Sequence, residues 1–183
     1  MPFSAAVLSS SNSSSTPPST LCSTTPNASP TPSSWDGKRS AICVRAFAAG
    51  GPAGDRPLLV CLPGGTYTRG YWDLQGPGHS GYSFARAAAG EGFPVVTLDS
   101  LGTGESTRPA HDIEMTDQAA AAASAVAQIP AVLGVATPAV AVGHSMGALT
   151  LWQYIRDFGT SRLARACFID QSPKLITDDT WSH

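Results

Sequence analysis

The sequence has few charged residues, and those it has form no cluster of one sign. Only 13% of its 183 residues are charged, the formal net charge is −2, and the sequence pI is about 6.0. Proteins that bind nucleic acid carry a basic patch that neutralises phosphate groups, and no run of Lys and Arg occurs here. We therefore expect no nucleic-acid partner.

Charge is missing altogether from residues 1–34, which consist largely of Ser, Thr and Pro. Such a composition buries too little apolar surface to offset the entropy lost on ordering, so it predicts a disordered tail. The segment lacks both the basic and apolar regions of a secretory signal and the arginines of a mitochondrial presequence. We expect a cytoplasmic protein, with plastid targeting as the alternative because transit segments are Ser-rich and poor in acids.

Metal-site spacing is also absent. The four cysteines form no CxxC or CxxH pair, and three of them lie within apolar runs. Buried, reduced thiols explain this pattern better than a disulfide framework or a metal site. We expect no metal ion and no cofactor. The three cysteines in apolar runs are Cys43, Cys61 and Cys167.

A long uncharged stretch, residues 118–155, raises the question of a membrane span. Its first part is rich in alanine rather than leucine, and Pro130, Gly134 and Pro138 interrupt it. Membrane helices need about 20 strongly apolar residues in succession. The stretch therefore predicts a core helix followed by a buried strand, and no membrane span.

Apolar runs alternate with helix-like segments along residues 35–183. This order predicts an α/β fold with a mostly parallel sheet and helices on both faces. The first two strands, joined by a turn-rich segment, are expected to form an antiparallel pair. Strands are predicted at 40–47, 57–62, 94–100, 138–142 and 164–170, and helices at 80–90, 116–128 and 146–158. Thr116 is the expected cap of the second helix.

The stretch GHSMG, residues 143–147, lies at a predicted joint between a strand and a helix. A sharp turn at that joint leaves room only for very small residues two positions before and after the serine, and Gly143 and Gly147 stand there. Such an elbow exposes the hydroxyl of Ser145 and directs the Met146 amide, at the start of the helix, toward the same point. Ser145 is thus the predicted nucleophile, with a chance GxSxG match as the alternative.

A second oxyanion donor is expected from the loop Leu62-Pro-Gly-Gly-Thr66, which follows the second predicted strand. The Gly65 amide is our first choice and the Thr66 amide our second, while a simple glycine-rich turn is the alternative. A further glycine-rich stretch, DSLGTGES (99–106), contains no lysine and is not expected to bind phosphate. We interpret it as a turn capped by Asp99.

Together GHSMG, LPGGT and DSLGTGES, in this order and spacing, resemble the α/β-hydrolase fold family over about residues 40–180. The run IDQSPK (169–174) looks like its esterase and cofactor-free haloperoxidase-like branches. The resemblance implies a Ser145 nucleophile, an oxyanion hole from Met146 and Gly65, and a cap that starts after about residue 173. One departure is Pro63-Gly64, where those branches usually carry His-Gly.

The resemblance also implies a catalytic acid and a histidine that follow the serine in the chain. Asp170, at the end of the strand predicted at 164–170, is a candidate acid, and capping of its loop is the alternative. No histidine follows an eighth strand: the four are His79, His111, His144 and His183. We therefore expect residues 35–183 to be the N-terminal part of a hydrolase domain that lacks its last strands.

The expected function is that of a serine hydrolase acting on a small ester or acyl compound through an acyl-enzyme at Ser145. Because the predicted nucleophile is Ser rather than Asp, dehalogenase and epoxide hydrolase chemistry are disfavoured. Without an evident catalytic histidine, this chain is expected to be inactive or weak. The alternative is a non-catalytic hydrolase-like fragment or binding protein.

Overall fold

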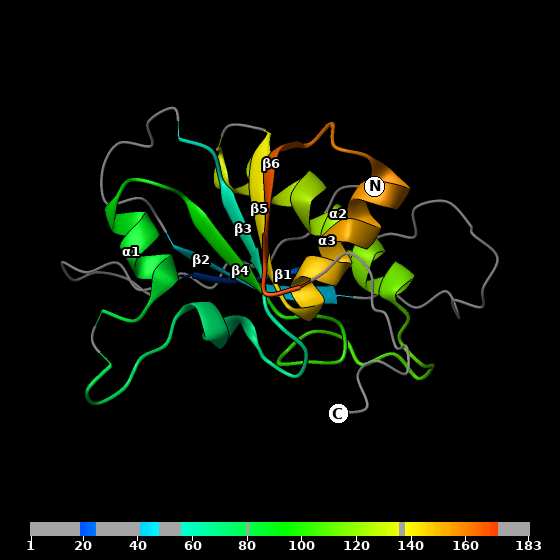
Figure 1. Cartoon of the computed structure of the whole chain (residues 1–183), viewed down its shortest axis with the longest axis horizontal. Helices are drawn as coiled ribbons and strands as arrows, with labels where there is room; N and C mark the ends of the chain where they lie inside the picture. The colour runs from blue at the N-terminus through cyan, green and yellow to red at the C-terminus, as the bar shows by residue number, and fades with distance from the viewer. Residues whose placement is uncertain (1–18, 25–40, 48–55, 80, 136–137, 172–183) are drawn as a thin grey trace, which may run out of the picture.

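The computed structural model describes residues 19–24, 41–47, 56–79, 81–135 and 138–171. Its centre is one sheet with the strand order β1-β2-β4-β3-β5-β6, and the sheet separates α1 from α2 and α3 (Figure 1). The predicted α/β class, with helices on both faces, is confirmed. The strands are β1 Ser19–Thr24, β2 Ala41–Phe47, β3 Leu59–Leu62, β4 Val95–Leu98, β5 Ala139–His144 and β6 Leu163–Ile169. The helices are α1 Phe84–Gly90, α2 Met115–Leu133, α3 Met146–Phe158 and the 3₁₀ helix η1 Arg69–Trp72.

Strand order differs from the prediction at one point. We expected β2 and β3 to form an antiparallel pair, but β4 lies between them, antiparallel to β2 and parallel to β3. All four residues of β4 are buried, as is typical of a strand inside a sheet covered on both faces, and α1 provides the crossover that parallel β3 and β4 require. Strands β3, β5 and β6 continue the parallel part.

Two apolar cores lie on opposite faces of the sheet, as the alternation of side chains along β3 shows. Val60 and Leu62 belong to the core beneath α2 and α3, while Leu59 and Cys61 belong to the core beneath α1. Burial on both faces explains why β3 reads as a continuous apolar run rather than an alternating one. The carboxyl ends of β3, β4 and β5 consequently lie in rigid surroundings.

Helix α2 is longer than predicted at both ends. It begins after Glu114, whose amide donates a 3.0 Å hydrogen bond to the Asp117 carboxylate, so Glu114 rather than Thr116 is the N-cap. It continues through Pro130 and ends at Gly134, which has φ 62°. Within the described residues, no helix combines the length and the apolar character that a membrane crossing requires.

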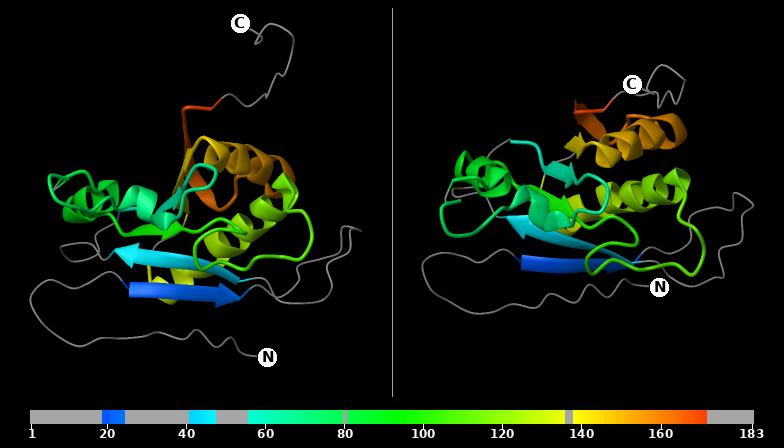
Figure 2. Two further views of the ribbon diagram at one scale, coloured as in Figure 1. Left: turned by 90° about the horizontal axis from the view of Figure 1, so that it is seen from below. Right: turned by 60° about the horizontal axis from the view of Figure 1, so that its bottom comes forward.

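The predicted disordered tail, residues 1–34, is wrong for six residues. Ser19–Thr24 form β1, which pairs antiparallel with β2 at one edge of the sheet (Figure 2). Strand pairing uses backbone N–H and C=O groups that any composition supplies, so a segment with few apolar side chains can still form a strand. The rest of that segment and the cap expected after about residue 173 lie outside the described residues.

Candidate active site

The joint between β5 and α3 holds Ser145 in an unusual backbone conformation. Its φ is 50° and its ψ is −116°, and few residues other than glycine adopt a positive φ. The carbonyl of Ser145 accepts a 2.9 Å hydrogen bond from the Ala148 amide in the first turn of α3. The chain thus turns from strand to helix at this one residue, and packing must hold it there.

Gly143 and Gly147 provide that packing by backbone contact. A Cβ atom on Gly143 would lie 2.7 Å from the amide nitrogen of Ala148, and one on Gly147 would lie 2.6 Å from the carbonyl oxygen of Pro63. Both distances are shorter than real Cβ contacts, and backbone cannot move aside as a side chain does. The joint therefore accepts only glycine at these two positions.

Strand β6 brings a second residue of interest to the same edge. The Ser145 amide donates a 2.9 Å hydrogen bond to the carbonyl of Ile169, the last residue of β6. Asp170 follows directly with φ 53°, and its side chain is 87% exposed. Ser145 is half-buried, and in the part of the chain that the structure describes its Oγ has no hydrogen-bond partner. The site therefore presents a hydroxyl and a carboxylate at neighbouring strand ends.

The loop after β3 packs directly on the Ser145 joint. A Cβ on Gly65 would lie 3.1 Å from Cε of Met146, and a Cβ on Gly64 would lie 2.9 Å from Nδ1 of His144. The loop turns where the Tyr67 amide donates to the Gly64 carbonyl at 3.3 Å. Thr66, within this turn, has φ 67°. Gly65, the first choice as second donor, thus lies beside Met146, and Thr66 follows it in the same turn.

The described histidines have partners other than Ser145. The ring of His144 stacks on Tyr71, with centroids 4.8 Å apart and planes at 10°, and its Nε2 is 4.0 Å from the Asp170 carboxylate. Nε2 of His111 is 3.6 Å from the carboxylate of Asp117. His79 lies edge-on to a tyrosine ring, and His183 lies outside the described residues. No imidazole in the described ranges is hydrogen-bonded to Ser145.

A charged network lies at the carboxyl end of β4, and its arginine has no signal in the sequence. Asp99, fully buried, accepts hydrogen bonds from the amide of Arg69 at 2.6 Å, from the guanidinium of Arg69, and from the amide of Glu105 at 3.0 Å. The Arg69 guanidinium also pairs with the Glu105 carboxylate. The network ties η1 to the turn 99–106, which we expected Asp99 to cap.

The charges within this network shift two pKa values. Burial alone would lower the pKa of Arg69, but the hydrogen bond to Glu105 and the charge of Asp99 outweigh it and raise that pKa. The hydrogen bond from Arg69, and then its charge, lower the pKa of Glu105. Both groups are therefore held in their charged forms.

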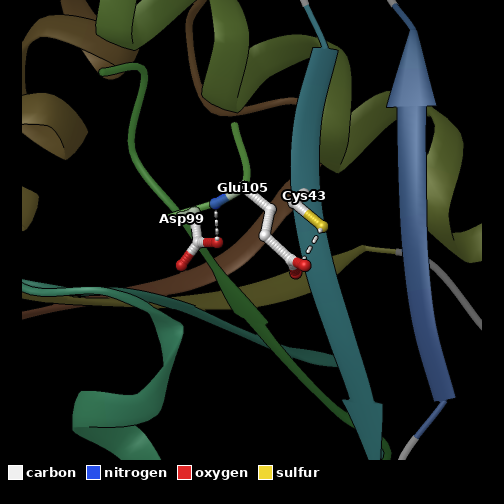
Figure 3. Close-up of side chains that lie close together, drawn as sticks. All are labelled: Cys43, Asp99 and Glu105. Atoms are coloured by element: carbon white, nitrogen blue, oxygen red, sulfur yellow. Dashed lines mark hydrogen bonds between the residues drawn. The ribbon is translucent and has the colours of Figure 1, made fainter. Parts of the chain in front are cut away.

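Cys43, Asp99 and Glu105 offer three donor atoms that lie within 4.8 Å of one another (Figure 3). The thiol of Cys43 points at the Glu105 carboxylate, with Sγ 3.6 Å from Oε2, and the Glu105 amide points at Asp99. Arg69 already places a positive charge on both carboxylates. A metal ion would have to displace that guanidinium, so the residues fit an arginine-centred ion cluster better than a metal site.

The sequence matches a known protein family. A model described as the alpha/beta hydrolase family matches residues 59–181, more than half of the chain. The chain belongs to the alpha/beta hydrolase family. The resemblance that we drew from three glycine-containing motifs is thereby confirmed. No curated protein matches the sequence at a significant level.

Solved structures of hydrolases share the fold. An esterase from Thermogutta terrifontis has 19% identity and a TM-score of 0.55, and the match covers 80% of this chain and 44% of the esterase. An epoxide hydrolase from Vigna radiata has 16% identity and a TM-score of 0.57, covering 77% of this chain and 40% of its own. A hydrolase from Pseudomonas aeruginosa has 19% identity and a TM-score of 0.59, covering 88% of this chain and 50% of its own. The chain thus spans half or less of the length of these proteins.

Proposed function

We propose that this alpha/beta hydrolase chain carries the nucleophile of a serine hydrolase, Ser145, which acts on a small carboxylic ester. The observation that carries the proposal is the backbone of Ser145, at φ 50° and ψ −116°, between two glycines whose positions leave no room for a Cβ. Strain of this kind costs about 1–3 kcal/mol, persists only where the surrounding structure enforces it, and clusters at active sites. A serine that served only the fold would not need it.

The proposed reaction is acyl transfer. Oγ of Ser145 attacks the ester carbonyl carbon and loses its proton to a base, the alcohol leaves with a proton, and water then hydrolyses the acyl-enzyme to the acid. The developing oxyanion would accept hydrogen bonds from the Met146 amide, at the start of α3, and from the amide of Gly65 or Thr66. The contact between Gly65 and Met146 supports this choice of donors.

The proposed reaction needs a base that accepts the proton of Ser145. We propose Asp170 as the acid because it follows β6 at the same sheet edge as Ser145, yet its carboxylate faces His144. In the ranges described, no imidazole bonds to Ser145, so its hydroxyl stays protonated and reacts slowly. We therefore propose that the 183-residue chain has low turnover.

Two other functions are less well supported. Epoxide hydrolases proceed through an alkyl ester of an aspartate, and this chain has serine at the corresponding joint, so an ester is the better substrate class. A non-catalytic binding protein with a hydrolase-like pocket is the second candidate. The observation in its favour is that Oγ of Ser145 has no hydrogen-bond partner among the described residues.

Hydrolysis of p-nitrophenyl acetate by the 183-residue chain tests the proposal. We expect slow release of p-nitrophenol above the buffer rate, unchanged in Ser161→Ala and abolished in Ser145→Ala. Ser161 is the matched control because it is an exposed serine between α3 and β6. Turnover that survives in Ser145→Ala would contradict the proposal, and no turnover with tight ester binding would favour the binding protein.

A further inference from the structure

His144, the neighbour of Ser145 in the chain, contacts three separate segments around the site. Its ring stacks on Tyr71 of η1, its Nδ1 lies against Gly64 in the loop after β3, and its Nε2 is 4.0 Å from the carboxylate of Asp170 after β6. The side chain is only 17% exposed. A residue that only filled the surface beside Ser145 would not need contacts with three segments.

The contact with Gly64 is the tightest of the three. A Cβ on Gly64 would lie 2.9 Å from Nδ1 of His144 and 3.3 Å from its Cε1, so the imidazole fills the space that any other residue at position 64 would need. Nδ1 is buried and has no hydrogen-bond partner within the described residues. The ring is therefore placed by shape rather than by a hydrogen bond at this nitrogen.

The two remaining contacts fix the plane and the outer edge of the ring. Stacking on Tyr71, with planes at 10°, leaves the imidazole little freedom to tilt. Asp170 supplies the facing charge at Nε2, at a distance too long for a direct hydrogen bond. Tyr71 in turn lies against Tyr67 and Trp72, which are both uncharged. The ring is thus held on one face, at its inner edge and at its outer edge.

We infer that His144 is a positioning residue, which acts as a spacer between the Ser145 joint and the loop that holds Gly64 and Gly65. The inference rests on the proposed function. His144 is bonded to Ser145, and Gly64 is bonded to Gly65, so the width of the ring sets the distance between the serine and the proposed second oxyanion donor. An error of about 1 Å in such a distance can cost about a hundredfold in rate.

The rate at which a fluorophosphonate labels Ser145 in the full chain tests this role. We expect His144→Ala to lower the labelling rate by about tenfold or more, since the loop loses its spacer. His144→Phe keeps a flat ring against Tyr71 and Gly64 and should recover most of that rate. The matched control is His79→Ala, which also removes an imidazole beside a tyrosine ring and should leave the rate unchanged.

A second pair of variants tests the contact itself. Gly64→Ala should slow labelling in the wild-type background, because its Cβ would displace the imidazole. It should slow labelling much less in His144→Ala, where only the Tyr67 ring, 3.3 Å from that Cβ, remains close. Equal effects in both backgrounds, or a rate for His144→Ala equal to that of His79→Ala, would overturn the inference alone. An unlabelled wild-type chain would overturn the proposed function, and the inference with it.

Discussion

Two turns at the carboxyl edge of the sheet are held in different ways. The turn after β5 is held by backbone contact, since Gly143 and Gly147 leave no space for a side chain. The turn after β4 is held by charge, since the carboxylate of Asp99 accepts two backbone amides and a guanidinium. One turn depends on glycines packed against backbone, and the other depends on three specific side chains, with Gly104 leaving room for the Asp99 carboxylate.

This difference decides which polar group is left for chemistry. Both carboxylate oxygens of Asp99 accept hydrogen bonds from Arg69 or Glu105, so this carboxylate is committed to the fold. The steric turn needs nothing from the hydroxyl of Ser145, which keeps no hydrogen-bond partner in the described part of the chain. A turn held by glycine backbone does not need the side chain of its serine. A turn held by ion pairs commits the charged side chains to the fold.

The largest expected effect comes from breaking the steric turn. Gly147→Val places carbon atoms within 2.6 Å of the Pro63 carbonyl oxygen, and neither backbone segment can yield. We expect a loss of at least about 3 kcal/mol in the free energy of unfolding, measured by urea denaturation, or no folded protein at all. Gly90→Ala is the control, because a Cβ there meets nothing within 4 Å. A folded Gly147→Val chain of normal stability would show that the turn is not steric.

A somewhat smaller loss should follow from breaking the charged turn. Asp99→Asn leaves the guanidinium of Arg69, which is only 12% exposed, with Glu105 as its remaining carboxylate partner. Removing one member of a buried ion pair costs about 3–5 kcal/mol, and the partner that remains places this variant near the lower value. Asp157→Asn removes a carboxylate from an ion pair with Arg156 on the surface of α3 and should cost less than about 0.5 kcal/mol. Equal urea midpoints for the two variants would contradict the comparison.

Much of the Ser145 turn could be predicted from the sequence, because its demands are local. The bounds of α3, Met146–Phe158, agree with the predicted helix, and both glycines occupy the positions that the turn requires. The charged turn was predicted only in part. Asp99 was expected to cap it, but Arg69 comes from a segment 30 residues earlier in the chain, and no local pattern marks an arginine that pairs across such a distance.

The order of the strands was beyond prediction for a similar reason. Adjacent strands in the chain pair often, so β2 with β3 was the natural expectation. The place of β4 between them rests on backbone pairing with strands that lie more than 30 residues earlier in the chain, which no local pattern marks. The N-cap of α2 was missed for a local reason, because Glu114 and Asp117 form a reciprocal capping box and Thr116 is already within the helix.

The smallest expected effect is a change with pH in the stability that Glu105 gives to the charged turn. Arg69 lowers the pKa of Glu105 in the folded chain below the ordinary value of 4.5. A lowered pKa stabilises the fold at pH values above 4.5, and the stabilisation disappears as the pH falls through the folded value. The difference in urea midpoint between wild type and Glu105→Gln should therefore be largest near pH 7 and should shrink below pH 4.5. A difference that does not change with pH would mean that the charge of Glu105 contributes nothing.

We propose that the hydroxyl of Ser145 is the reactive group of this chain. Its most direct test is to treat the 183-residue chain with a fluorophosphonate and to locate the adduct by mass spectrometry of peptides. We predict a single modified peptide that contains residues 143–147, with the adduct on Ser145, and no adduct in Ser145→Ala. An adduct on another residue, or undiminished modification of Ser145→Ala, would contradict the claim.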